Sequence, residues 1–149
     1  MHINDAAGTL PRLTNMGIDP FLTPSAIACI VAQRLARRLC MGCKEPISLS
    51  EAVLRNLGFP FDLRQDEKMA FHKPGGCEKC HGSGYLGRVD VYELMLVTED
   101  VETLALSRSS ADEIGRAVVK AGMTRMRADG LTKAAQGVTP IEETMRTTV

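Results

Sequence analysis

Four of the five cysteines form two pairs, and the members of each pair are separated by two residues. Cys40 pairs with Cys43, and Cys77 pairs with Cys80. Two intervening residues let the backbone fold back, so both sulfur atoms can face one ion from the same side. Two such turns supply four soft sulfur ligands, which suits a closed tetrahedral Zn2+ site. One C-x-x-C pattern is weak evidence, but two in a chain of 149 residues predict a metal site.

Two other uses of these cysteines, disulfides and haem, are less favoured. Residues 1–5 are polar and lack the apolar segment of a secretory signal, so we expect a reducing compartment in which paired cysteines bind metal. Residues 77–81 also match C-x-x-C-H, the attachment pattern of c-type haem, but haem leaves Cys40 and Cys43 without a role. We interpret His81 as a turn residue beside the metal or as a spare ligand displaced by sulfur. The fifth cysteine, Cys29, is interpreted as an apolar core residue.

The composition excludes some classes of function. The formal net charge is zero, which argues against a protein that holds nucleic acid mainly by neutralising phosphates. No apolar run approaches the length of a membrane span. Aromatic residues make up 4% of the chain and tryptophan is absent, so the core must be aliphatic. We expect a modest soluble protein of one domain or a few small sub-domains.

A long helix is predicted just before the first cysteine pair. Thr23 and Pro24 form a typical helix start, with threonine as the N-cap and proline at the first helical position. The helix is predicted to end near Leu39 and to bury a stripe made of Ile27, Ile30, Val31, Leu35 and Leu39. It also carries Arg34, Arg37 and Arg38, with Lys44 just beyond. These cations are interpreted as a solvated face with favourable charge at a helix C-terminus or, alternatively, as contacts to an anion or an acidic partner.

The remaining elements are short. Residues 5–16 and 48–57 predict helices, residues 69–73 predict a strand, and residues 87–96 predict the best strand of the chain. The C-terminal third is predicted to be helical, with helix starts at 98–100, 110–113 and 139–142 and a helix at 123–136 that is interrupted near Gly130. The unit around the cysteines has little core, so zinc would supply much of its folding free energy.

Several segments together carry a resemblance to one protein family. They are residues 2–6 (HINDA), 15–22 (NMGIDPFL), 33–40 (QRLARRLC), 76–85 (GCEKCHGSGY), 87–94 (GRVDVYEL), 129–133 (DGLTK) and 137–143 (GVTPIEE). In this order they resemble the C-terminal part of bacterial type II secretion and type IV pilus assembly ATPases, the general secretion pathway protein E family. Residues 2–6 are similar to the family's histidine box, His-Thr-Asn-Asp-Ala, with Ile3 in place of threonine.

The resemblance implies an α+β, mainly helical fold in three parts. Residues 1–39 would be the end of a RecA-like ATPase core, residues 40–96 a tetracysteine zinc domain with short strands, and residues 97–149 a helical extension. It implies that the paired cysteines bind Zn2+ and that His2 belongs to the nucleotide-sensing histidine box.

The resemblance also implies a function. Family members are cytoplasmic homo-hexamers at the inner membrane that hydrolyse ATP with Mg2+ and drive pseudopilus or pilus assembly through inner-membrane platform and assembly proteins. The phosphate-binding loop G-x-x-x-x-G-K-[ST] is absent from these residues. We therefore expect the C-terminal part of such a motor, with no catalytic residue of its own and no activity alone. The cysteines favour a secretion or pilus-assembly motor over a pilus-retraction motor.

The alternative is a stand-alone zinc ribbon that binds protein or nucleic acid. Residues 77–84 also resemble one repeat of the zinc region of J-domain chaperones, which binds unfolded chains. The residues after Cys43 do not repeat the glycine pattern, and the neutral charge counts against nucleic acid.

Overall fold

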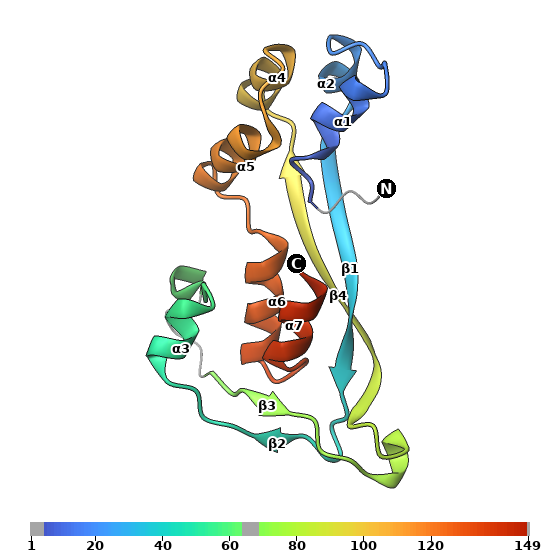
Figure 1. Cartoon of the computed structure of the whole chain (residues 1–149), viewed down its shortest axis with the longest axis vertical. Helices are drawn as coiled ribbons and strands as arrows, with labels where there is room; N and C mark the ends of the chain where they lie inside the picture. Colours follow the sequence, from blue (N-terminus) through green and yellow to red (C-terminus); the bar gives the residue numbers. More distant parts are fainter. Residues whose placement is uncertain (1–4, 64–68, 149) are drawn as a thin grey trace. The chain divides into compact units, whose positions relative to one another are not determined.

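A computed structural model describes residues 5–63 and 69–148, so His2 lies outside the described residues. They form an α+β fold of helices and small sheets (Figure 1). None of the helices in this part of the chain is long and apolar enough to cross a bilayer. The helices and strands are α1 (Thr9–Asn15), α2 (Leu22–Ala26), β1 (Cys29–Leu39), β2 (Glu45–Pro46), α3 (Glu51–Asn56), β3 (His72–Lys73), β4 (Tyr85–Leu96), α4 (Glu99–Leu106), α5 (Ala111–Lys120), α6 (Met126–Ala135) and α7 (Ile141–Thr147).

The chain divides into two compact units. The first comprises the described residues up to Ala32 together with Tyr92–Arg125, and the second comprises Gln33–Val91 together with the residues from Met126 onward. Both boundaries fall inside a long strand, so β1 and β4 each contribute to both units. The three-part division into residues 1–39, 40–96 and 97–149 stays a prediction.

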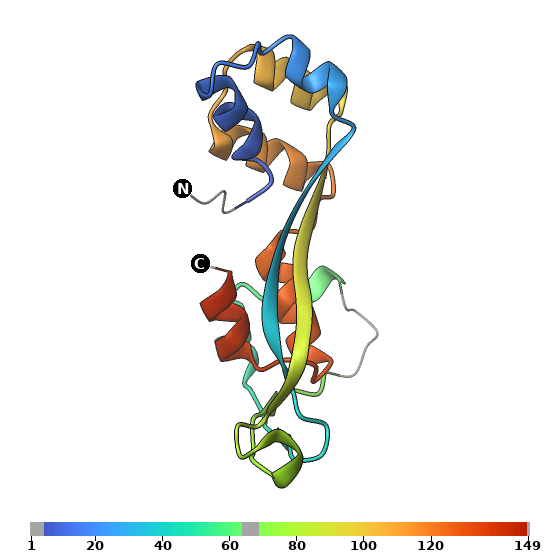
Figure 2. The ribbon, with the colours of Figure 1, turned by 90° about the vertical axis from the view of Figure 1, so that its right-hand side faces the viewer.

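The first unit is built around α1, α2, α4 and α5. Contacts join these helices in the order α1, α2, α4, α5 and back to α1 (Figure 2). The predicted start of α5 is confirmed, because Ser110 and Glu113 cap it reciprocally. The helices enclose an aliphatic cluster with Ala6, Ala7, Leu10, Met95, Val101, Ile114 and Val118 at its centre.

The two long strands, β1 and β4, pair with each other and run in opposite directions (Figure 1). On β4 the side chains of Val91, Glu93 and Met95 are buried and the intervening ones are exposed, which is the period of a strand. The predicted strand at residues 87–96 is confirmed and begins two residues earlier, at Tyr85.

The predicted helix from Thr23 to Leu39 is wrong. α2 ends at Ala26, and the residues from Cys29 to Leu39 form β1. Exposed and less exposed side chains alternate over the first eight positions of β1, which is a period of two, although the apolar run also fits a helical period. Pairing with β4 decides for the strand, because the hydrogen bonds of the pair satisfy the main-chain polar groups of β1. Cys29 is exposed, so its predicted place in the core is also wrong.

The second unit contains α3, α6, α7 and the antiparallel pair β2 and β3. β2 and β3 pair Glu45 with Lys73 and Pro46 with His72. The hydrophobic cluster of this unit is made of Leu54, Phe59, Phe71, Leu131, Ala134, Ala135 and Ile141. The helix predicted at residues 48–57 is present as the shorter α3, and its N-cap is Ser50, whose hydroxyl accepts a hydrogen bond from the Val53 N–H.

α6 passes through Gly130 without a break, so the predicted interruption there is wrong. The glycine instead allows close packing between elements. A Cβ at this position would lie 2.6 Å from Cγ2 of Thr144 on α7 and 2.9 Å from Cγ1 of Val91 on β4. The Thr144 hydroxyl donates a hydrogen bond of 3.2 Å to the Gly130 carbonyl, which fixes α7 against α6.

We expect Gly130→Ala to destabilise the chain by about 1–2 kcal/mol, because overpacking costs about 1–3 kcal/mol and the better helix propensity of alanine returns up to about 1 kcal/mol. Urea denaturation measures the change in the free energy of unfolding. Arg127→Ala, at an exposed position of the same helix, is the matched control and should stay within about 0.5 kcal/mol of the parent chain. A Gly130→Ala protein as stable as the parent would contradict the packing argument.

Candidate metal centre

The four paired cysteines meet at one place. Their sulfur atoms all lie within 4.8 Å of one another. Sγ of Cys40 is 3.8 Å from that of Cys77, and Sγ of Cys80 is 3.7 Å from those of Cys43 and Cys77. All four are free thiols rather than disulfides. A metal–sulfur distance of about 2.3 Å puts the ligands of a tetrahedral ion about 3.8 Å apart. The group therefore has the geometry to hold one metal ion.

Strand pairing brings the two cysteine turns together. The first turn joins β1 to β2, and the second joins β3 to β4. Because β1 pairs with β4 and β2 pairs with β3, both turns must lie where the two strand pairs meet (Figure 1). The Cys40 N–H donates a hydrogen bond of 2.9 Å to the Gly84 carbonyl and ties one turn to the other.

Backbone N–H groups of the second turn point at the sulfur of Cys80. Those of Cys77 and Gly84 donate to it at 3.3 and 3.2 Å. The bond from Cys77, followed by the bond from Gly84, lowers the pKa of Cys80 to about 6. Gly84 has φ of 76°, and a Cβ there would lie 2.6 Å from Cβ of Pro74, so the turn needs glycine.

The pKa of the Cys43 thiol is shifted upward instead. Burial, followed by hydrogen bonds with the neighbouring thiols, raises the pKa of Cys43 to about 12. Four negative charges within this radius repel one another, so without a cation the thiols cannot all ionise near neutral pH. A divalent cation would remove this penalty and hold all four as thiolates. Four thiolates would also close the coordination shell, which is the arrangement of a structural rather than a catalytic metal.

His81 and Cys29 do not belong to the cluster that the described residues form. His81 is exposed and ends the short helical turn Glu78–Cys80 with a left-handed φ of 51°. Its interpretation as a turn residue is confirmed.

Comparison with known proteins identifies the family of the chain. Residues 1–146 match the model of the type II/IV secretion system protein family. The chain belongs to this family. It is 42% identical over 149 residues to the type IV pilus assembly ATPase PilB of Acinetobacter baylyi, covering 99% of this chain and 25% of that protein. It is 38% identical over 148 residues to the type II secretion system ATPase E of Vibrio cholerae, covering 99% of this chain and 28% of that protein. The chain thus spans about a quarter of the length of these curated relatives.

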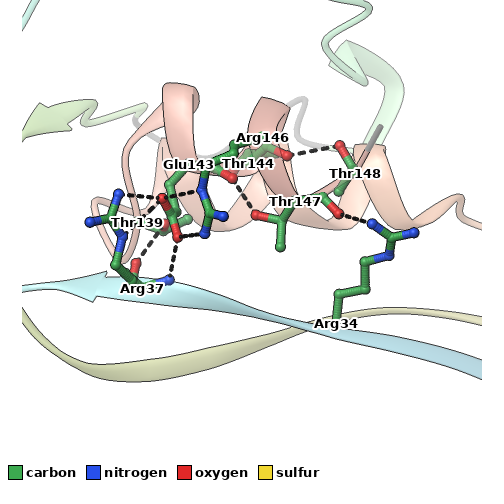
Figure 3. Close-up of polar contacts among 8 residues, drawn as sticks. All are labelled: Arg34, Arg37, Thr139, Glu143, Thr144, Arg146, Thr147 and Thr148. Atoms are coloured by element: carbon green, nitrogen blue, oxygen red, sulfur yellow. Dashed lines mark hydrogen bonds and ion pairs between the residues drawn. The ribbon is translucent and has the colours of Figure 1, made fainter.

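A buried carboxylate that the sequence did not reveal, Glu143, is bonded to Arg37, three residues before the first cysteine of the cluster. The Glu143 side chain is 1% exposed and accepts three hydrogen bonds from Arg37. The Arg37 main-chain N–H donates to Oε1 at 3.0 Å, and its guanidinium donates to Oε2 at 2.8 and 3.1 Å (Figure 3). Arg146, one helical turn further on, donates to both oxygens at 2.6 and 3.1 Å. The only sequence signal was helical spacing, which puts Glu143 on the face of Thr147 without an apolar neighbour to mark that face as buried.

Two of the three arginines of β1, Arg34 and Arg37, are bonded to α7. Nη1 of Arg34 donates a hydrogen bond of 2.9 Å to the Thr147 carbonyl (Figure 3). Burial by itself would raise the pKa of Glu143, but the hydrogen bonds from Arg146 and Arg37 outweigh it and lower the pKa to about 2.

We expect Glu143→Gln to lower the free energy of unfolding at pH 7 by about 1.5–3 kcal/mol, since hydrogen bonds to charged groups are lost. Because the folded pKa of Glu143 lies below the unfolded value of about 4.3, this contribution is present above about pH 5 and is lost as the pH falls towards 2. Urea denaturation at several pH values should show the gap between parent and variant shrinking over that window. Glu142→Gln, at the exposed neighbouring position, is the control and should show no such gap. A gap that is the same at pH 7 and pH 3 would contradict the assignment.

Proposed function

We propose that this chain is the C-terminal, zinc-binding part of an ATP-hydrolysing motor that powers type II secretion or type IV pilus assembly. The observation that carries the proposal is the family match, which extends across residues 1–146 and includes both cysteine pairs. The curated relatives are named as secretion and pilus assembly ATPases, and the chain covers about a quarter of each.

Zinc is the metal that the donor set favours. All four donors are soft sulfur atoms, and the cluster within the described residues contains no carboxylate or imidazole. Thiolates select zinc over Mg2+ or Ca2+, which prefer oxygen ligands. A closed sulfur shell leaves no position for a reacting water, so the role of the ion is structural. It would fix the direction in which the chain leaves β1 and returns through β4.

Nucleotide chemistry is assigned to other parts of the motor. These 149 residues contain no phosphate-binding loop, so the backbone amides and lysine that hold ATP and Mg2+ would lie elsewhere in a longer protein. Residues 1–39 would complete a RecA-like core, with His2 in its nucleotide-sensing histidine box. The motor would work as a cytoplasmic homo-hexamer at the inner membrane, and its partners would be the platform and assembly proteins there.

The zinc unit is suited to transmitting force rather than to hydrolysis. A metal-closed pair of turns at the ends of two long strands is stiff, because each turn is held by its sulfur ligands and by the hydrogen bond from Cys40 to Gly84. In the motor this unit would act as a rigid contact that passes nucleotide-driven movement to a membrane-bound partner.

We expect the chain to bind one Zn2+, as native mass spectrometry can measure. Replacing any of Cys40, Cys43, Cys77 or Cys80 with serine should abolish stoichiometric binding and loosen the surrounding turns, because structural zinc contributes about 10 kcal/mol or more to the folding of small sites. Cys29→Ser is the matched control, since this cysteine is exposed and outside the cluster. Retention of a well-folded chain in excess chelator would contradict the site, and loss of zinc in the control would overturn the ligand assignment.

The role in the motor is tested in the full-length protein. With Cys77 and Cys80 replaced by serine, secretion or piliation should fall sharply, while ATP hydrolysis by the purified motor should keep a substantial part of its rate. The reason is that the ion holds a contact surface and does not touch the nucleotide. Cys29→Ser again serves as the control. If ATP hydrolysis and ring assembly are lost together with secretion, the zinc unit is part of the fold of the ATPase and the coupling role is wrong.

A further inference from the structure

The loop between α6 and α7 contacts the first cysteine turn on both sides. Before the turn, the Leu39 N–H donates a hydrogen bond of 2.8 Å to the Val138 carbonyl. After the turn, Nζ of Lys44 donates a hydrogen bond of 2.8 Å to the Gly137 carbonyl. The residues that flank Cys40 and Cys43 are therefore held by a segment that lies almost a hundred residues further along the chain.

Thr139, two residues before α7, and Glu143 on α7 both bond to Arg37. The Thr139 hydroxyl donates a hydrogen bond of 2.9 Å to the Arg37 carbonyl, while Glu143 accepts from the Arg37 N–H at 3.0 Å (Figure 3). Both main-chain polar groups of Arg37 are thus bonded to this C-terminal segment, three residues before the first ligand. Thr139 is fully buried, so its hydroxyl is committed to this bond.

Arg37 also reaches the second cysteine turn. Its guanidinium, held by Glu143, lies 4.0 Å from the centre of the Tyr85 ring, which is a cation–π contact. Tyr85 directly follows Gly84, whose N–H donates to the sulfur of Cys80 and whose carbonyl accepts from Cys40. A continuous series of contacts therefore runs from Glu143 through Arg37 and Tyr85 to both pairs of ligands.

We infer that the α6–α7 hairpin holds the two cysteine turns in place for the metal and that Glu143 is the positioning residue of this hairpin. Through Arg37, Glu143 holds the two cysteine turns at the separation that four metal–sulfur bonds require. Partners that hydrogen-bond directly to metal ligands typically change metal affinity by about 10–100-fold when they are replaced, and we expect an effect in this range for Glu143, which acts through Arg37. The effect is reciprocal, because a metal that binds the ordered arrangement also stabilises the docking of α7. The inference rests on the proposed zinc site and is independent of the motor role.

A purely structural ion pair makes a different prediction. If Glu143 only stabilised the fold, its loss would lower the melting temperature but leave the zinc affinity of the folded chain unchanged. A positioning role changes the zinc affinity at temperatures where every variant is fully folded. The two roles are therefore separated by measuring zinc affinity and melting temperature on the same proteins.

The test uses the full chain and a chromophoric zinc chelator that competes for the ion. Glu143→Gln, which keeps the shape and removes the charge, should weaken zinc binding by about 10–100-fold. Glu142→Gln is the control on the same helix, and Glu51→Gln removes an exposed ion pair with Arg55 elsewhere in the unit. Both controls should bind zinc like the parent chain. Equal zinc affinity in Glu143→Gln and the parent overturns the inference, whatever happens to the melting temperature.

Two further measurements keep the test decisive. If Glu143→Gln does not fold, Thr139→Val removes a single hydrogen bond to Arg37 and should still weaken zinc binding measurably, whereas parent-like affinity overturns the inference. Hydrogen exchange should show that zinc increases the protection of amides in α7, with α5 of the other unit as the reference; an unchanged α7 overturns the reciprocal effect. A parent chain that binds no zinc instead refutes the proposed zinc site, so the two failures are distinguishable.

Discussion

Mutual repulsion among four sulfur atoms is the constraint on which the second unit depends. The sulfurs lie within 4.8 Å, and the pKa of Cys80 is lowered to about 6 while that of Cys43 is raised to about 12, so the thiols do not all ionise at the same pH. A bound cation would offset the repulsion among four thiolates and link the two turns. The strands that meet at these turns would then gain a fixed end in addition to the hydrophobic cluster of the unit.

At Glu143, too, neighbouring groups offset the cost of a buried charge. A carboxylate with a side chain 1% exposed would be costly by itself, and two guanidinium groups and a backbone N–H make it acceptable. Its partner Arg37 stays half exposed and stacks on Tyr85, so one side chain serves the buried acid and the strand surface together. The cysteine cluster and the group formed by Glu143 and its arginines both lie at the C-terminal end of β1. The chain there forms many hydrogen bonds for this reason.

Sequence reasoning succeeded where the signal was local and failed where it depended on distant residues. The spacing within each cysteine pair is local, so the meeting of the four cysteines was predictable from residues 40–43 and 77–80. The apolar run from Ile27 to Leu39 fits both helical and strand periods, and only its pairing with β4 decides for the strand. Glu143 could not be found because the residue that makes its burial possible, Arg37, is 106 positions away.

The discontinuity of both units has a consequence for the order in which the chain can fold. During synthesis all four ligands have been added by residue 80, whereas Glu143 follows more than sixty residues later. In the first unit, the Ala6 N–H finds its acceptor on Glu93 only after 87 further residues. Long sequence separations of this kind slow folding, because the loop must close before the contact stabilises it. In the second unit, β2 and β3 can pair once residue 73 has been made and the four cysteines can meet once residue 80 has been made, whereas α7 can dock only after more than sixty further residues.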